Sequence, residues 1–299
     1  MNEDIYEKYR LAGKIAAEAR DFGVSIIEEG VKYLDIAEKI ESKIVKSGAG
    51  IAFPVNIARN ELAAHYSPRS DDNSIIKKGD VIKLDVGAHI DGYIADTALT
   101  VEIDTNKYSD MIKASSDALE NAIKNIKENF SLSDIGKIVE DTISSYGYTP
   151  IDNLTGHSLE QYELHSGISV PSVSKSFNKI TPKVGDVLAI EPFATNGAGH
   201  VIAGNGSNIF LCNRSFRSKI IRDHRSKVIF SKLLNKFNTL PFAQRWCEKI
   251  FPKGEIALKK LSFLGLIKHY PQLIEIKGGI VTQKEHTVII TEDGCEVIT

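Results

Sequence analysis

Hydrophobic residues recur at helical spacing in two consecutive segments near the start of the chain. In residues 5–22 one stripe holds Ile5, Leu11, Ala12, Ile15 and Ala16. Residues 33–46 carry a similar stripe, and the two segments are followed by Gly23 and Gly48. Apolar side chains three or four positions apart share one helix face, and glycine commonly ends a helix, so the pattern predicts two amphipathic helices. A short apolar run at 81–86 then predicts a strand.

The same order of elements occurs a second time. Residues 108–130 and 132–146 have helical spacing, and residues 187–191 form another short apolar run. Both predicted strands begin with Gly-Asp-Val and reach an acidic residue six positions after the glycine, at Asp85 and Glu191. Two helices followed by such a strand, found twice, predict a duplicated α+β fold. Gly-Asp-Val could also be an ordinary way to enter a strand, but the repeated helix pairs favour duplication.

A basic segment with a mostly helical pattern interrupts this order. Its apolar stripes lie at 228–237 and 256–266, and the chain returns to strand patterns at 280–282 and 287–290. We therefore expect one α+β domain with a helical subdomain inserted into it. The predicted ranges are 1–207 and 271–299 for the α+β domain and 208–270 for the insert.

Composition places the chain among ordinary soluble globular proteins. It has 299 residues, of which 42% are hydrophobic and 25% charged, and its formal net charge is -2. No apolar run reaches the roughly 20 residues that a bilayer-spanning helix needs, and no secretory signal is visible at the start. The three cysteines are few and widely spaced, which fits neither a disulfide framework nor a cysteine zinc site. These features predict a cytoplasmic protein with reduced cysteines and no membrane association.

The small net charge conceals an uneven distribution. Residues 214–268 contain fourteen Lys and Arg against Asp223, Glu248 and Glu255, a net charge of +11, which leaves -13 on the rest of the chain. A basic patch on an acidic body suggests a polyanionic partner such as nucleic acid. A solvated basic face without a partner is the alternative, and charge alone slightly favours it.

Two aspartates flank a predicted hairpin. Asp85 and Asp96 lie on either side of Asp91-Gly92, a dipeptide that favours tight turns. A hairpin bent there brings the two carboxylates across from one another. Two neighbouring buried carboxylates are costly unless a cation lies between them. The alternative is one acid at the edge of the core and one in solvent, but the pair in this context favours a metal site.

Three further residues complete an oxygen-rich set. His157 lies at the entry to the second half, Glu191 ends the repeated strand, and Glu285 lies between two strand-like runs. A single histidine is more often packed in the core, but here it accompanies four carboxylates. Such a set suits divalent Mn, Co, Fe or Zn, and five ligands suit two ions sharing bridging oxygens better than one ion.

In this order and context, the five residues resemble the metal ligands of the pita-bread metallopeptidases. That family includes methionine aminopeptidases, prolidases and X-Pro aminopeptidases, and it has a duplicated α+β fold. Residues 53–56 and 63–68 resemble the type II methionine aminopeptidase segment that carries an active-site histidine. Residues 156–167 resemble its metal-ligand and substrate-histidine segment, and the basic insert resembles the helical subdomain of that type.

The resemblance implies removal of the initiator methionine from nascent chains, with a small second residue preferred, by a monomeric cytoplasmic enzyme. It implies two divalent ions and water as the nucleophile. Asp85 would hold one ion, His157 and Glu191 the other, and Asp96 and Glu285 both. The implied proton carrier is Glu191, the implied catalytic and substrate-binding histidines are His65 and His165, and the implied walls of the methionine slot are Phe53 and Leu164.

Two other functions fit parts of the pattern. One is an X-Pro aminopeptidase or prolidase with the same metals, although the early position of Asp85 leaves no room for a large N-terminal domain. The other is a ribosome- or RNA-binding relative that has lost catalysis, which the presence of all five ligand types argues against. The basic insert could still dock such an enzyme on ribosomal RNA near emerging chains.

Overall fold

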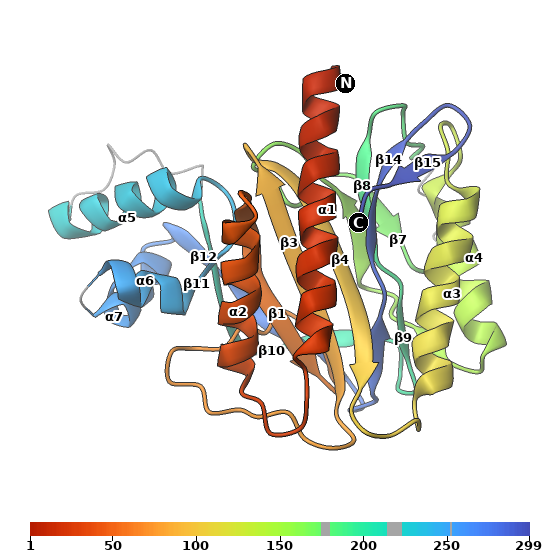
Figure 1. Ribbon diagram of the computed structural model, residues 1–299, viewed down its shortest axis with the longest axis horizontal. Helices are drawn as coiled ribbons and strands as arrows, with labels where there is room; N and C mark the ends of the chain where they lie inside the picture. The colour runs from red at the N-terminus through yellow and green to blue at the C-terminus, as the bar shows by residue number, and fades with distance from the viewer. Residues whose placement is uncertain (175–179, 214–222, 252) are drawn as a thin grey trace.

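The computed structural model describes residues 1–174, 180–213, 223–251 and 253–299. In the N-terminal half, two helices cover one face of a three-stranded antiparallel sheet of order β1-β3-β4 (Figure 1). The helices are α1 (Glu3–Ser25) and α2 (Tyr33–Lys46), and the strands are β1 (Gly50–Arg59), β3 (Val81–Ile90) and β4 (Tyr93–Glu102). Ala12, Ile15 and Ala16 of the first predicted stripe are buried in one core with residues of α2 and these strands, as the helical spacing predicts. The prediction that Leu11 lies on the buried face is wrong, because its side chain is 47% exposed.

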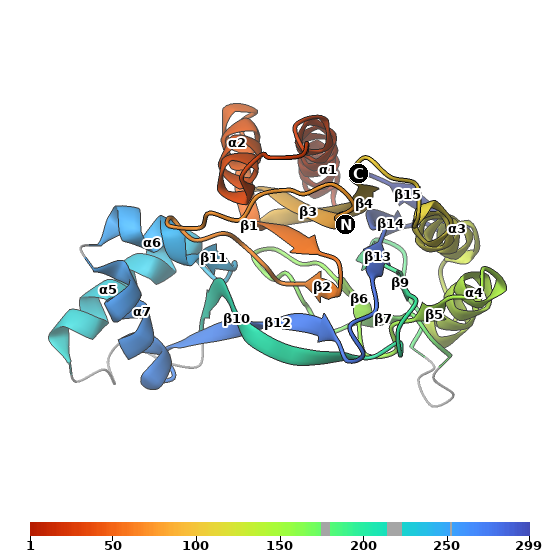
Figure 2. The same cartoon turned by 90° about the horizontal axis from the view of Figure 1, so that it is seen from below.

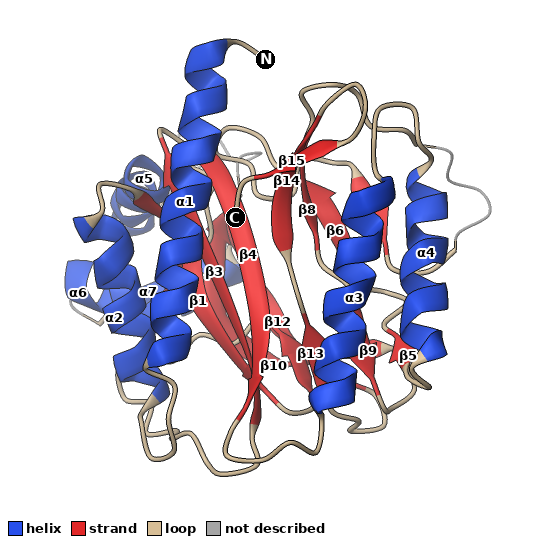
Figure 3. Ribbon diagram, turned by 45° about the vertical axis from the view of Figure 1, so that its right-hand side comes forward, coloured by secondary structure: helices blue, strands red, loops and turns tan. Residues whose placement is uncertain are grey.

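The C-terminal half repeats this arrangement. Helices α3 (Ser109–Asn125) and α4 (Leu132–Ser145) pack on strands that form their own core, and both helix pairs lie outside the strands (Figure 3). One sheet has the order β15-β14-β8-β6-β7 and a second has the order β13-β9-β5. The strands are β5 (Thr149–Pro150), β6 (Thr155–Ser158), β7 (Ser169–Pro171), β8 (Val187–Ile190), β9 (Phe193–Thr195), β13 (Val281–Gln283), β14 (His286–Ile290) and β15 (Cys295–Val297).

The two Gly-Asp-Val segments form the same turn in both halves. Gly79 and Gly185 have φ angles of 83° and 90°, a conformation that glycine adopts at little cost. Asp80 and Asp186 each accept a hydrogen bond from the backbone N–H of the lysine three positions earlier, at 2.9 and 2.8 Å. The turn then leads into β3 in one half and β8 in the other. The predicted duplication is therefore confirmed in local geometry as well as in element order.

A third layer closes the molecule on the inner side of the strands (Figure 2). It is a sheet of order β11-β10-β12-β2, built from β2 (Leu62–Ala64), β10 (Val201–Cys212), β11 (Phe242–Ala243) and β12 (Ile267–Glu275). Between β10 and β12 the chain forms α5 (His224–Phe237), α6 (Gln244–Ile250) and α7 (Gly254–Phe263), which share a core with the ends of those two strands. The helical insert thus extends from the end of a long two-stranded ribbon.

The structure changes some of the predicted boundaries. The helix predicted over 108–130 ends at Asn125, because Ile126 takes an extended conformation with ψ of 131° and Asn129 has a φ of 60°. The limits of the predicted insert, 208 and 270, fall inside β10 and β12. The division into domains at those residues therefore stays a prediction. The two predicted stripes lie on α5 and α7, whereas α6 carries no stripe that sequence periodicity identified.

A buried ion pair joins the insert to the N-terminal half. The guanidinium of Arg245 on α6 contacts the carboxylate of Glu41 on α2, which also accepts a 2.9 Å bond from the Trp246 indole N–H. Arg245 further donates to Ser67 Oγ at 2.7 Å and to the Pro68 carbonyl at 2.9 Å. Because a buried charge needs its partners, these contacts fix the insert relative to the segment that follows His65.

None of the helices that the structure describes is long and apolar enough to cross a membrane.

Candidate metal centre and active site

Asp85 and Asp96 lie on the same face of the β3–β4 hairpin. The two-residue turn at Asp91-Gly92 pairs Asp85 with Ala98 and Asp96 with Gly87. The two aspartates are therefore diagonal neighbours, and not the directly opposite pair that a hairpin centred between them would give. Side chains two positions apart on a strand share a face, so both carboxylates still point into the interior between the two halves.

The C-terminal half brings three more ligand types to the same place. His157 lies on β6, and Glu191 and Glu285 lie directly beyond the paired ends of β8 and β14. The His157 Nε2 atom is 3.7 Å from Asp96 Oδ2 and 3.7 Å from Glu191 Oε1. Ligand atoms of Asp96, His157 and Glu285 all lie within 4.8 Å of one another. All five predicted ligands line one inner chamber of about 60 Å³.

Hydrogen bonds across the two halves hold these residues in place. The Thr287 hydroxyl accepts from the Asp96 backbone N–H and donates to the Asp96 carbonyl, both at 2.8 Å. The Glu285 backbone N–H donates to the Ala98 carbonyl at 2.9 Å, and Gln283 Nε2 donates to the Glu191 carboxylate at 3.2 Å. The predicted ligands therefore lie on or directly beside strands that are paired or hydrogen-bonded to one another, which favours a precise site.

Four carboxyl groups lie close together in the chamber, an arrangement that favours a bound cation. Burial raises the pKa of Asp85 to about 7, and burial together with the neighbouring carboxylates raises the pKa of Asp96, Glu191 and Glu285 well above their usual range. Asp85 Oδ1 and Asp96 Oδ1 are buried without a hydrogen-bond partner among the described residues. Burial lowers the pKa of His157 to about 3, so the ring stays neutral and keeps a lone pair for a metal. This donor set fits divalent ions.

Two further histidines border the chamber. His65 has a φ of 63°, its Nδ1 lies 3.3 Å from the Pro271 carbonyl, and its ring packs edge-on to Tyr270 at 5.2 Å. The ring of His165 lies 4.3 Å from that of His157. Desolvation is the main cause that lowers the pKa of both His65 and His165 to about 4. Both rings are therefore neutral at physiological pH, and each offers one N–H donor and one acceptor.

Apolar side chains form the remaining walls of the inner chamber. Phe53 on β1 and Leu164 on the loop after β6 line it, as the resemblance implies. Phe53 lies directly against Gly87, where an added Cβ would stand 2.2 Å from the ring. A glycine at this position of the Asp85-Val-Gly segment is thus what lets an aromatic ring pack beside the two aspartates.

Six residues that line the inner chamber were not identified as site residues from the sequence. They are Asn56, Ala64, Ile209, Pro241, Tyr270 and Gln283. Three of them, Ile209, Pro241 and Tyr270, lie within the range assigned to the helical insert, which therefore contributes a wall of the site. The remaining three are close in sequence to predicted residues, a signal that could have been used: Asn56 is three positions after Phe53, Ala64 directly precedes His65, and Gln283 is two before Glu285.

A comparison with protein-family models identifies the chain. Residues 7–292 match the model of metallopeptidase family M24. The chain belongs to metallopeptidase family M24. Among curated members, it is 46% identical over 299 residues to a methionine aminopeptidase from Methanocaldococcus jannaschii, covering 100% of both chains. It is 43% identical over 290 residues to one from Thermococcus onnurineus, covering 96% of this chain and 97% of the relative. Within the M24 family, the chain therefore groups with the methionine aminopeptidases.

Solved structures give the fold of this M24 chain independently. A thermophilic Arx1 superimposes with a TM-score of 0.87 at 18% identity, covering 100% of this chain and 91% of that chain. A methionine aminopeptidase from Thermotoga maritima gives a TM-score of 0.73 at 21% identity, covering 100% and 98%. A prolidase from Pyrococcus furiosus gives 0.64 at 18% identity, covering 100% and 64%. The predicted pita-bread α+β fold is confirmed.

As an M24 metallopeptidase the chain requires divalent metal. The buried carboxylates of the chamber predict how the stability of the metal-free protein depends on pH. A buried acid whose pKa is raised in the folded state destabilises that state progressively as pH rises from the pKa of the unfolded chain to the raised value, and fully above it. We expect Asp85→Asn to raise the melting temperature of chelator-treated protein at pH 8 by a few degrees, on the order of 2 kcal/mol. The gain should shrink as pH falls through 7 towards 4.

Differential scanning calorimetry on chelator-treated protein measures this effect. The exposed Asp293 is a suitable control, because Asp293→Asn removes the same charge from a surface position. A gain for Asp85→Asn that does not depend on pH would contradict the raised pKa of that carboxyl group.

Proposed function

We propose that this chain is the enzyme that removes methionine from the free N-terminus of peptides and nascent proteins. The observation that carries the proposal is the convergence of Asp85, Asp96, His157, Glu191 and Glu285 in one buried chamber. Curated methionine aminopeptidases that match the chain at 41–46% identity over at least 96% of its length support the same substrate.

We propose that those five residues hold two divalent ions from the set Co, Mn, Fe and Zn. Asp85 would hold one ion, His157 and Glu191 the other, and Asp96 and Glu285 would contact both. Such a pair supplies an activated water molecule and polarises the scissile carbonyl. What the protein adds is a fixed cluster in which Thr287 holds the backbone of Asp96 and Gln283 orients the Glu191 carboxylate.

The remaining polar groups carry protons and stabilise charge. Glu191 adjoins the neutral ring of His157 and is our candidate for passing a proton to the leaving amine. His65 and His165 stay neutral at the rim of the chamber. His165 would donate an N–H to the oxygen of the tetrahedral intermediate, whereas His65 donates its Nδ1–H to the Pro271 carbonyl, so its Nε2 would accept a hydrogen bond from the leaving amide. His65 is held there by the Pro271 carbonyl and the Tyr270 ring.

Substrate selection follows from the size and polarity of the chamber. Phe53, Leu164 and Ile209 provide apolar walls for an unbranched thioether side chain. The chamber is only about 60 Å³, so a bulky residue after the methionine would meet the walls. This supports the proposed preference for a small second residue.

Peptide hydrolysis with defined substrates tests the proposed function. We expect the metal-loaded protein to cleave Met-Gly-Met-Ser at least about 100-fold more efficiently than a Xaa-Pro dipeptide, because only the former places methionine in the slot and a small residue after it. N-acetylated Met-Gly-Met-Ser should be inert, since its amine is blocked. Preferred cleavage of the Xaa-Pro peptide would instead identify an X-Pro peptidase.

The helical insert supports a second proposed role, which is docking on ribosomal RNA. In this proposal the enzyme is a monomer in the cytoplasm. Lysine side chains are exposed on α5 to α7 and the adjoining turns, and Phe263 is 90% exposed. Lysines bind phosphates and an exposed aromatic ring can stack on a base. Part of the charge is already paired, because Lys260 contacts Asp223 and Lys249 contacts Glu38. Arg245 is buried, and the basic residues between 214 and 222 lie outside the described residues.

Co-sedimentation with ribosomes at increasing salt tests the docking proposal. Replacing Lys232, Lys236, Lys253 and Lys259 with alanine should weaken binding and flatten its salt dependence, since fewer counterions are released. Replacing four exposed lysines elsewhere, for example Lys14, Lys46, Lys78 and Lys277, is the charge-matched control. Equal loss in both sets, or no loss in either, would contradict docking through the insert.

A further inference from the structure

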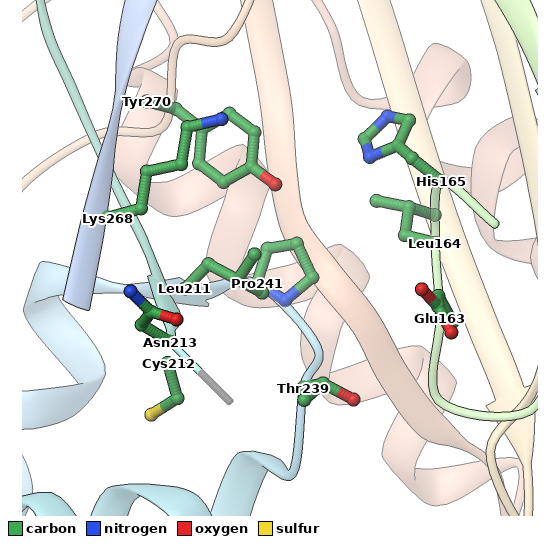
Figure 4. Close-up of a pocket in the computed structure, with 10 residues that line it drawn as sticks. All are labelled: Glu163, Leu164, His165, Leu211, Cys212, Asn213, Thr239, Pro241, Lys268 and Tyr270. Atoms are coloured by element: carbon green, nitrogen blue, oxygen red, sulfur yellow. The ribbon is translucent and has the colours of Figure 1, made fainter. Parts of the chain in front are cut away.

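A second, larger cavity opens directly onto the metal chamber. It has a volume of about 430 Å³ and shares Leu164, His165, Pro241 and Tyr270 with the inner chamber. Its other walls come from the loop at Glu163 and from the ribbon and insert, as Figure 4 shows for Lys268, Leu211 and Thr239. The outer cavity therefore leads from the catalytic residues to the surface, between the α+β halves and the insert.

This cavity continues the inner chamber and has room for a peptide. The inner chamber of about 60 Å³ admits little beyond the methionine and a small second residue. The outer cavity of about 430 Å³ falls within the range of ordinary ligand pockets. This step rests on the proposed function: the occupant of the outer cavity is the substrate chain beyond the second residue.

Lys268 places a positive charge in this cavity close to the catalytic residues, which favours an acidic substrate side chain there. It lies on β12, and its ammonium is 5.4 Å from the centre of the Tyr270 ring, which in turn contacts the His65 ring. Lys268 is exposed, and no carboxylate of the described residues lies within ion-pair distance of it. In Figure 4 it extends along Tyr270 on the wall facing His165.

The only acidic side chain among the described walls is on the opposite side. Glu163 lies on the loop that carries Leu164 and His165, across the cavity from Lys268 (Figure 4). The two charges are not an ion pair, so each is available to a substrate side chain. The ammonium of Lys268 lies over Tyr270, which lines the inner chamber and contacts His65, whereas the carboxylate of Glu163 makes no hydrogen bond or ion pair with a described residue of that chamber. A residue soon after the scissile bond thus meets the ammonium first.

We propose that Lys268 is a specificity-determining residue that selects substrates with a carboxylate at the third or fourth position. An exposed ion pair of this kind contributes roughly a 2- to 5-fold difference. It acts mainly on KM, because the contact forms in the ground state and persists in the transition state. The preference is screened by salt, since the charges are separated by solvent.

Matched peptides that differ in one charge measure this selectivity. The series Met-Gly-Xaa-Ser-amide and Met-Gly-Ser-Xaa-amide, with Xaa as Asp, Asn or Lys, keeps the cleavage site and removes the C-terminal carboxylate. We expect kcat/KM to follow the order Asp, Asn, Lys at one or both positions, with the ratio shrinking in 0.5 M salt. Equal values for the three peptides at both positions would overturn the proposal and leave methionine removal intact. Absence of cleavage of every peptide would instead contradict the proposed function itself.

Variants assign the preference to the residue. Lys268→Ala should bring the Asp and Lys peptides to the same kcat/KM, and Lys268→Glu should reverse their order. Lys14→Glu, on the outer face of α1, is the charge-matched control and should keep the wild-type ratio. A uniform loss of activity in Lys268→Ala with the ratio unchanged would place its effect on the neighbouring histidines and overturn the proposal. So would loss of the ratio in Lys14→Glu.

Discussion

Replacing Glu285 with alanine is expected to lower kcat/KM for Met-Gly-Met-Ser by at least about 1,000-fold, because residues that act as a unit in a metal site lose most of the catalysis together. Glu285 is 2% exposed and stands among Asp96, His157 and Glu191, so alanine there removes one of the clustered carboxylates that would hold the metal. Steady-state hydrolysis of the peptide, with metal content measured on the same samples, gives the result.

Folding must be separated from catalysis in this experiment. Removing one of several repelling buried carboxylates should leave the metal-free protein at least as stable as the wild type, so a loss of activity without a loss of melting temperature is expected. Glu292→Ala, at an exposed turn, should keep activity within about two-fold, as surface changes usually do. Activity of Glu285→Ala within ten-fold of wild type would remove this carboxylate from the mechanism.

Replacing His65 with asparagine is expected to lower kcat by about 100- to 1,000-fold with a smaller change in KM, because a group that stabilises charge acts mainly in the transition state. Asparagine is the suitable substitute, because His65 has a φ of 63° and asparagine tolerates that left-handed conformation better than alanine does. The backbone and the contact between β2 and β12 should therefore survive the change.

A second histidine provides the control for this experiment. His200 is exposed and pairs with Asp152 away from the chamber, so His200→Asn should leave both kinetic constants near the wild-type values. Stopped-flow or initial-rate measurements over a range of substrate concentrations separate kcat from KM. A rise in KM alone in His65→Asn would make His65 a residue for ground-state binding and not for catalysis.

The parts of the fold that the sequence predicts are those with a local physical signal. Amphipathic stripes identify α1 to α4, α5 and α7, and the Gly-Asp-Val turn is recognisable because a positive φ requires glycine and the aspartate caps its own turn. The five ligands are predicted because carboxylates in or beside apolar strands conflict with burial unless a cation is present. The structure brings all five into one chamber.

What the sequence does not predict depends on contacts between distant segments. Ile209 and Tyr270 reach the chamber only because β10 and β12 form a ribbon that crosses the site before the insert begins. In the sequence, Arg245 looks like one more exposed charge of a basic segment. In the structure it is buried against Glu41 and Ser67. Long-range pairing decides these positions, and local pattern carries no information about it.

Metal binding measured together with activity tests the central claim most directly. Chelator-treated protein should be inactive, and titration with Mn²⁺ or Co²⁺ in a calorimeter should show binding that restores hydrolysis of Met-Gly-Met-Ser, with up to two ions per chain. Binding and recovery should both be absent in Glu285→Ala and Asp96→Ala. Full activity in protein that has been shown to contain no divalent metal would contradict the account, because the five buried side chains would then have no cation to bring them together.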